Sequence, residues 1–151
     1  MSDRYMVDSN VLIYLSNSAS PFRVLTATAV SKLRSLGLEL CVCPQSIIEL
    51  RSVLTRPLSS PNGIGMPTTD ADAEVADHLN SFTLISDSAA VFDSWKSLVE
   101  GIGVRGKQNH DARMMAAASA GGCTHLLTFN DSDFMRYTAL SSVTTVNPTS
   151  I

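Results

Sequence analysis

Five short apolar runs alternate along the chain with longer segments that have the character of helices. The apolar runs cover residues 5–7, 39–43, 82–85, 124–129 and 143–146. The expected helices cover residues 11–15, 22–36, 45–54, 70–80, 89–101 and 109–120. Strands joined by helices pair in parallel, and helices then cover both faces of the sheet. The alternation therefore predicts an α/β fold, an α/β/α sandwich around a central parallel sheet of about five strands, with residues 1–151 as a single domain.

The composition is typical of a globular protein in a reducing compartment. Apolar residues make up 44% of the 151 residues and charged residues 17%, which excludes a disordered chain. No apolar run approaches the ~18 residues that a membrane-spanning helix needs. Cys41 and Cys43, two of the three cysteines, lie in an apolar run. We therefore expect buried free thiols rather than disulfides or a zinc site, and a cytoplasmic location.

The formal net charge of −3 is unevenly distributed. Residues 70–100 contain seven acidic residues and one basic residue, which gives this segment a net charge of −6 and the remainder +3. The acidic residues of the segment are Asp70, Asp72, Glu74, Asp77, Asp87, Asp93 and Glu100. This distribution neither requires nor excludes an anionic partner such as RNA.

Three carboxylates lie where α/β proteins bind ligands, near the carboxyl ends of strands and on adjoining helices. Asp8 ends the first apolar run, Glu49 lies in the helix after the second, and Asp111 opens the helix before the fourth. Asp8 has a simpler interpretation, because Asp8, Ser9 and Asn10 could each cap a helix. A single helix cap needs only one of these three residues, so the other two could have a different role.

Glu49 and Asp111 also have simpler interpretations. Glu49 could face solvent and pair with Arg51 or Arg56. Asp111 could stabilise its helix by placing a negative charge at the positive end of the helix dipole. Glu49 is, however, flanked by apolar side chains, so we expect its carboxylate to be partly buried. A partly buried carboxylate needs a counter-charge or a metal ion.

A fourth polar group follows the apolar run at 124–129. It contains Asn130, Asp131 and Asp133, a composition that also suits an ordinary turn. Thr128 lies near the end of the strand, where its hydroxyl could orient a ligand or water.

All four groups are expected at the same edge of the sheet, where clustered carboxylates repel one another unless a cation neutralises them. Oxygen ligands of this kind suit Mg²⁺ or Mn²⁺ better than zinc. These ions activate water and stabilise the leaving oxygen in phosphodiester cleavage.

Together the motifs resemble those of PIN-domain ribonucleases, and more narrowly the VapC toxins of bacterial toxin–antitoxin pairs, over residues 5–148. They are VDSNVLIY, an in-helix Glu followed by RSVLTRP, GVRGKQNHDARMMAAA, HLLTFNDSDFMRY and a terminal VTTVNP. The resemblance implies a parallel sheet of order 3-2-1-4-5. It also implies one or two Mg²⁺ or Mn²⁺ ions and endonucleolytic cleavage of RNA.

The resemblance also implies roles for individual residues. The metal ligands would be Asp8, Glu49, Asp111 and Asn130. The catalytic carboxylates would be Asp8, Glu49, Asp111 and Asp133. Asn130 is neutral, and Asp133 could act through water or only fix its loop, so the fourth ligand stays open between them. Water, ligands or RNA phosphate would be positioned by Ser9, Thr128, Arg105, Lys107 and Arg113, although the three bases could equally belong to a solvated loop.

The implied partners are structured RNA (transfer or ribosomal RNA), a cognate VapB-type antitoxin and a second copy of the chain. A non-catalytic PIN module that binds RNA or a protein partner is the alternative. Phosphotransfer on an aspartyl nucleophile, as in haloacid-dehalogenase-like enzymes, is disfavoured because those enzymes need a second Asp where this chain has Asn10.

Overall fold

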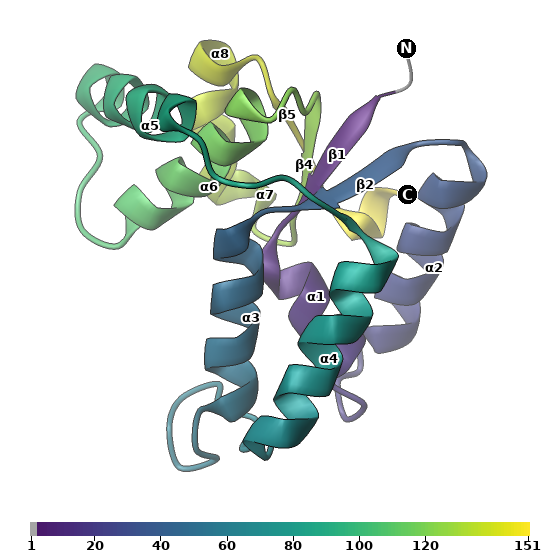
Figure 1. Cartoon of the computed structure of the whole chain (residues 1–151). Helices are drawn as coiled ribbons and strands as arrows, with labels where there is room; N and C mark the ends of the chain where they lie inside the picture. Colours follow the sequence, from purple (N-terminus) through teal and green to yellow (C-terminus); the bar gives the residue numbers. More distant parts are fainter. Residues whose placement is uncertain (1–2) are drawn as a thin grey trace.

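The computed structural model describes residues 3–151 and contains a sheet flanked by helices (Figure 1). The strands are β1 (Arg4–Val7), β2 (Glu39–Val42), β3 (Thr83–Leu84), β4 (His125–Leu127) and β5 (Thr144–Val146). The longer helices are α1 (Ser9–Ser16), α2 (Arg23–Ser35), α3 (Pro44–Thr55), α4 (Thr68–Ser81), α5 (Ala89–Ile102) and α6 (Gln108–Ala120). Short helical turns follow at α7 (Asp131–Phe134), Met135–Tyr137, α8 (Thr138–Ser141) and Pro148–Ser150. The prediction of one domain over 1–151 stays a prediction, since residues 1–2 lie outside the described part.

The five strands form one parallel sheet of order β3-β2-β1-β4-β5, which confirms the predicted order. β1 is central: Met6 is in register with Cys41 of β2 on one side and with Leu126 of β4 on the other. The order reverses between β1 and β4, and ligand crevices of parallel sheets form at such a point, outside the carboxyl ends of the strands.

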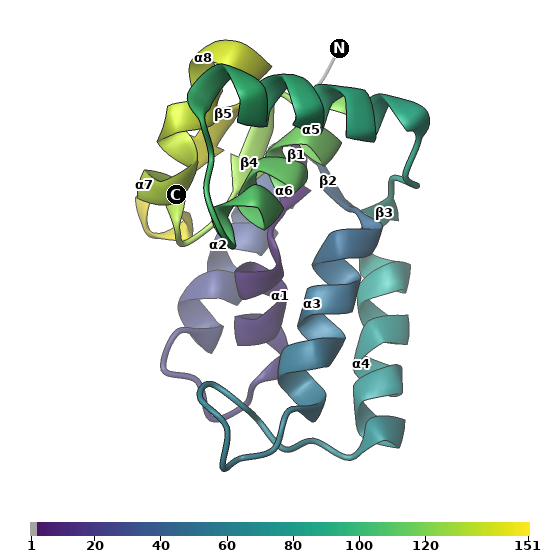
Figure 2. The same cartoon turned by 90° about the vertical axis from the view of Figure 1, so that its left-hand side faces the viewer.

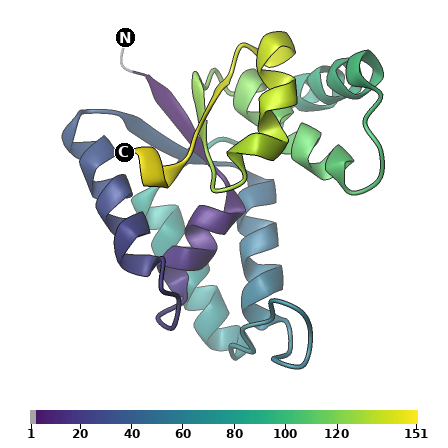
Figure 3. The same cartoon turned by 180° about the vertical axis from the view of Figure 1, so that it is seen from behind.

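Successive side chains of β1 and β4 point to opposite faces of the sheet and belong to two separate hydrophobic cores. Met6 and Leu126 pack against α5, α6 and the helical turns that follow β4, whereas Tyr5, Val7 and Leu127 pack against α1, α2, α3 and α4. α3 and α4 contact each other and run side by side away from the sheet (Figures 1 and 2). The last helical turn returns to contact α2 (Figure 3).

The composition of α6 explains why it lies so close to the sheet. Ala112, Met114 and Met115 are buried, as are the three alanines that follow them. Small side chains let the helix backbone approach the strands, which fixes the position of its first turn. Asp111 lies in that first turn.

The differences from the sequence-based expectation are confined to short elements. Residues 131–141 form brief helical turns where only a polar turn was expected, because four-residue helices carry no periodic signal. Cys41 and Cys43 are buried with free thiols, as predicted, although Cys43 lies beyond β2 at the start of α3; Cys123 is buried with a free thiol as well. Within the described residues, the helices are all too short or too polar to cross a membrane.

Candidate active site

Asp8 lies at the carboxyl end of β1 and is almost completely buried. One carboxylate oxygen, Oδ1, accepts a 2.7 Å hydrogen bond from the backbone N–H of Ser9, so Asp8 does cap α1. The other oxygen, Oδ2, accepts a 2.8 Å hydrogen bond from the hydroxyl of Thr128, just beyond β4. Capping of α1 therefore uses only one oxygen of this carboxylate. The other oxygen is oriented by Thr128, next to the neighbouring strand β4.

Asn10 joins the same network from the first turn of α1. Its amide nitrogen donates to the Thr128 hydroxyl oxygen at 3.1 Å, and its carbonyl accepts from the backbone N–H of Phe129 at 3.3 Å. The Thr128 oxygen also accepts from the backbone N–H of Asn130 at 3.0 Å. Asn10 thus ties α1 to the loop after β4, a role that the sequence did not reveal because the two segments are far apart in the chain.

Glu49 is half-buried on α3 and faces Ser9. The Ser9 hydroxyl donates to Glu49 Oε2 at 2.7 Å, and the side-chain amide of Gln45, one turn earlier, donates to Oε1 at 2.8 Å. The alternative of a surface ion pair with a nearby arginine is wrong for the described residues, because Arg51 pairs with Asp72 instead. Ser9 therefore links the first two carboxylates of the site.

The pKa of Asp8 reflects its burial first and the neighbouring acids second. Burial raises the pKa of Asp8 to about 6, from 3.8. The hydrogen bonds from Thr128 and from the Ser9 N–H lower this pKa, while the charges of Glu49 and Asp111 raise it. Burial and the neighbouring acids thus both disfavour the charged form of Asp8.

Asp111 has the same electrostatic character. Its pKa is raised by burial first, and then by the charges of Asp133 and Glu49. Lys107 and His110 act in the opposite direction but do not cancel these effects. In residues 3–151, none of the ion pairs formed by Lys or Arg involves the four carboxylates Asp8, Glu49, Asp111 and Asp133.

The loop after β4 carries two exposed side chains, Asn130 and Asp133, which the sequence suggested as alternatives for a fourth ligand. Asn130 precedes α7, and its side chain does not cap this helix. The negative charge of Asp133 helps to raise the pKa of Asp111. Asp131 is directed elsewhere, because it accepts a hydrogen bond from the amide of Asn147 at 3.0 Å.

The predicted RNA-contacting bases differ in their surroundings. Arg105 and Lys107 are exposed in the loop before α6. Arg113 is instead held by Asp87, at 3.0 Å, and by the side-chain oxygen of Gln45, also at 3.0 Å. Its guanidinium is therefore partly committed to internal contacts.

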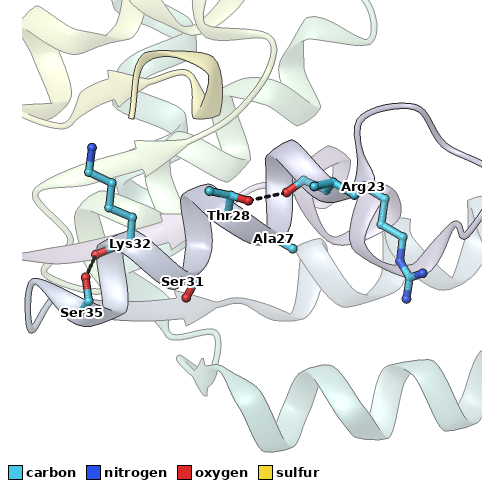
Figure 4. Close-up of a pocket in the computed structure, with 7 residues that line it drawn as sticks. Arg23, Ala27, Thr28, Ser31, Lys32 and Ser35 are labelled. Carbon is cyan, nitrogen blue, oxygen red and sulfur yellow. Dashed lines mark hydrogen bonds between the residues drawn. The ribbon is translucent and has the colours of Figure 1, made fainter.

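The side chains fit an oxygen-ligand cation site in chemistry, although they are not drawn tightly together. Across the described part of the chain, no three His, Cys, Asp or Glu side chains approach closely enough to form a ready-made metal site. A hollow of about 650 Å³ lies along one face of α2, with Arg23 and Lys32 near its ends (Figure 4). No carboxylate lines that hollow, so it is separate from the acidic cluster.

The PIN domain family matches residues 5–140 of the sequence. The chain belongs to the PIN-domain family. This match covers β1 to α8 and includes every acid of the cluster. A comparison with curated proteins found no significant match.

Solved structures of low sequence identity share the PIN fold. VapBC2 from Rickettsia felis, bound to a DNA fragment from its promoter, is 16% identical with a TM-score of 0.68, and the match covers 95% of this chain and 98% of that one. VapBC-1 from nontypeable Haemophilus influenzae is 15% identical with a TM-score of 0.68, covering 97% and 98%. VapC20 from Mycobacterium tuberculosis, described as a sarcin-ricin loop cleaving toxin, is 16% identical with a TM-score of 0.56, covering 81% and 86%.

Proposed function

We propose that this PIN-domain chain is an endoribonuclease that depends on Mg²⁺ or Mn²⁺ and acts as the toxin of a VapBC-type toxin–antitoxin pair. The observation that carries the proposal is the buried Asp8 carboxylate, which is oriented by two hydrogen bonds yet has no cationic partner in the described chain. Glu49 and Asp111 raise its pKa further. A cluster with this excess of negative charge favours a bound cation.

The proposed metal ligands are Asp8, Glu49 and Asp111, with Asn130 or Asp133 as the fourth. When bound, the ion supplies an activated water and stabilises the leaving oxygen of a phosphodiester. Thr128 and the Ser9 N–H fix the two oxygens of Asp8 in direction. This preorganisation reduces the reorganisation that cation binding requires.

Glu49 is positioned by contacts of its own. The Ser9 hydroxyl and the Gln45 amide hold its two oxygens, leaving the remaining lone pairs for a ligand or water. Arg105 and Lys107 are exposed in the loop before α6, the charge of Lys107 acts on Asp111, and both side chains would contact RNA phosphates. The expected products of cleavage are a 5′-phosphate and a 3′-hydroxyl.

The identity of the substrate and of the protein partners rests on the relatives. One structural neighbour is named as a toxin that cleaves the sarcin-ricin loop, which supports structured RNA (ribosomal or transfer RNA) as the substrate class. Other neighbours are VapBC complexes, which supports a cognate antitoxin as a partner. A basic antitoxin side chain could neutralise the acidic cluster in place of a cation. We also propose that the chain forms a homodimer in the cytoplasm.

Expression in a bacterial host without an antitoxin tests the toxin assignment. We expect the wild-type chain to arrest growth, and Asp8→Asn and Asp111→Asn to permit it at equal protein levels. Asp72→Asn is the matched control because Asp72 is exposed and paired with Arg51, so it should arrest growth like the wild type. Equal growth inhibition by all four chains would contradict a carboxylate-dependent toxin and favour the non-catalytic PIN module.

A further inference from the structure

Another pocket, of about 370 Å³, opens between α5 and the first turns of α6. Its apolar wall is formed by Val91, Phe92 and Trp95 of α5, and its polar rim includes His110 and Arg113 of α6. The volume lies within the range of about 300–1,000 Å³ that is usual for small-ligand sites. The pocket therefore fits an occupant of ligand size better than a flat protein surface.

The aromatic wall is rigid and accessible. Phe92 is 61% exposed, and its ring centroid lies 5.8 Å from that of Trp95 at an interplanar angle of 36°. The indole N–H of Trp95 donates to the backbone carbonyl of Asn109 at 2.9 Å, which fixes the indole against α6. An exposed phenylalanine on a fixed tryptophan offers a surface on which a flat ring can stack.

Gln45 connects the lining of the pocket to the acidic cluster through hydrogen bonds. The side-chain amide of Gln45 donates both to Glu49 Oε1 and to the backbone carbonyl of His110, each at 2.8 Å. Its carbonyl accepts from Arg113, which lines the pocket. His110 directly precedes Asp111 in the chain. The lining of the pocket is thus linked to Glu49 through one side chain and to Asp111 through the adjoining residue.

The charge around the pocket is mixed, because Asp87 also lines it and is paired with Arg113, so the cations that could meet a polyanion lie on the side of α6. Lys107 and His110 lie close enough to lower the pKa of Asp111, and Lys107 is exposed before α6. Phosphates on a path from the pocket to the carboxylates would pass Lys107. Single-stranded RNA combines such phosphates with bases that can be splayed out and stacked.

We propose that this pocket binds one unstacked base of the RNA substrate, with Phe92 and Trp95 as its stacking surface. The inference rests on the proposed ribonuclease function and adds a base-binding site beside the cleavage site. Removal of one stacking aromatic ring from such sites weakens binding by about 5- to 150-fold. Phe92 is therefore a substrate-binding residue that sets which nucleotide lies next to the cut.

Trp95 is the only tryptophan of the chain, so its fluorescence reports the pocket directly. We would titrate a ten-nucleotide single-stranded RNA into the Asp8→Asn protein with Mg²⁺. The titration would be repeated with ten further RNAs, each of which lacks the base at one position. Asparagine caps helices as well as aspartate does, so this variant should fold without cutting the RNA. We expect saturable quenching of Trp95 by the intact RNA and weaker quenching by one of the abasic RNAs.

Two further variants decide the outcome. Phe92→Ala in the same background should weaken RNA binding about 5- to 150-fold. Leu58→Ala, which removes another exposed apolar side chain, should leave it unchanged. Unchanged affinity of Phe92→Ala, with no quenching of Trp95, would overturn the base site. A change of oligomeric state in Phe92→Ala without loss of RNA affinity would also overturn it and identify the pocket as a protein interface.

Cleavage separates this inference from the proposed function. If the wild type cuts RNA and Phe92→Ala gives the same fragments at the same rate, the proposed nuclease function stands and the base-binding site is overturned. Failure of every variant to bind or cut RNA would overturn both.

Discussion

The hydroxyl of Thr128, at the end of β4, donates a 2.8 Å hydrogen bond to the buried carboxylate of Asp8, at the end of β1. These two residues belong to adjacent strands at the point where the strand order reverses. The bond therefore couples the register of the sheet to the orientation of the first acid of the site. Thr128 in turn accepts hydrogen bonds from Asn10 and from the N–H of Asn130.

Replacing Thr128 with valine should remove this bond while keeping the side-chain shape. The bond lowers the pKa of Asp8, so its loss should raise that pKa further above 6. We expect the variant to lose about 1–3 kcal/mol of unfolding free energy, because a buried acceptor loses its partner. Urea unfolding at pH 7 measures this loss. Thr28→Val is the control: Thr28 is exposed on α2 (Figure 4), and the change should stay within about 0.5 kcal/mol.

Asp8 should also make the stability of the metal-free protein fall as the pH rises. Its carboxyl holds a proton more tightly in the folded state, with a pKa of about 6, than in the unfolded chain, with 3.8. Its contribution is therefore fully present below about pH 4 and is lost as the pH rises through 6. A pKa of about 6 in place of 3.8 corresponds to about 3 kcal/mol.

Thermal unfolding in EDTA between pH 4 and 7.5 tests this linkage by comparing the wild type with Asp8→Asn. We expect the stability of the wild type, relative to the variant, to decrease across that range and to recover on addition of Mg²⁺ at pH 7. Parallel profiles for the two proteins would show that Asp8 is not the group responsible.

Gln45 should act as a positioning residue for Glu49. Its amide bridges Glu49 and the backbone carbonyl of His110. Gln45→Ala removes the hydrogen bond to one oxygen of the Glu49 carboxylate. We expect RNA cleavage to slow by about 10- to 100-fold, because small displacements of reacting groups reduce rates by such factors. The unfolding free energy should change little. Ile48→Ala, on the exposed side of the same helix, should cleave at the wild-type rate, and an equal defect in both variants would point to a general loss of α3.

Arg105 and Lys107 should contribute to RNA affinity through phosphate contacts. Each alanine variant should weaken binding and reduce the slope of log affinity against log salt by about 0.7. Filter binding to Asp8→Asn protein at several salt concentrations measures both quantities. Lys32→Ala removes a positive charge from α2, beside the separate hollow of Figure 4, and should leave the slope unchanged.

Local patterns predicted the framework of the molecule well. The strands and long helices follow apolar periodicity, Pro44 occupies the first helical turn of α3, and the family resemblance supplied the strand order. The acids Asp8, Glu49 and Asp111 were found because parallel strands bring their carboxyl ends to one edge. Their roles as metal ligands stay predictions.

Contacts between distant segments could not be predicted from local patterns. His78 shows no partner in the sequence, yet it is buried and lies 2.7 Å from the Ser16 hydroxyl across the α1–α4 contact. His125 stacks on Tyr5 at a centroid distance of 4.3 Å because β1 and β4 share a register. Arg113 was expected to face RNA, but its pairing with Asp87 depends on how α6 meets the loop before α5.

The most direct measurement of the central claim is cleavage of total bacterial RNA by the purified chain with Mg²⁺ or Mn²⁺ and with EDTA. The account predicts discrete fragments with 5′-phosphate ends from the wild type and from Asp72→Asn. It predicts no fragments in EDTA, nor from Asp8→Asn or Asp111→Asn. Fragments that persist in EDTA or in the two carboxylate variants would contradict the proposed metal-dependent nuclease, as would intact RNA with folded, metal-loaded wild type.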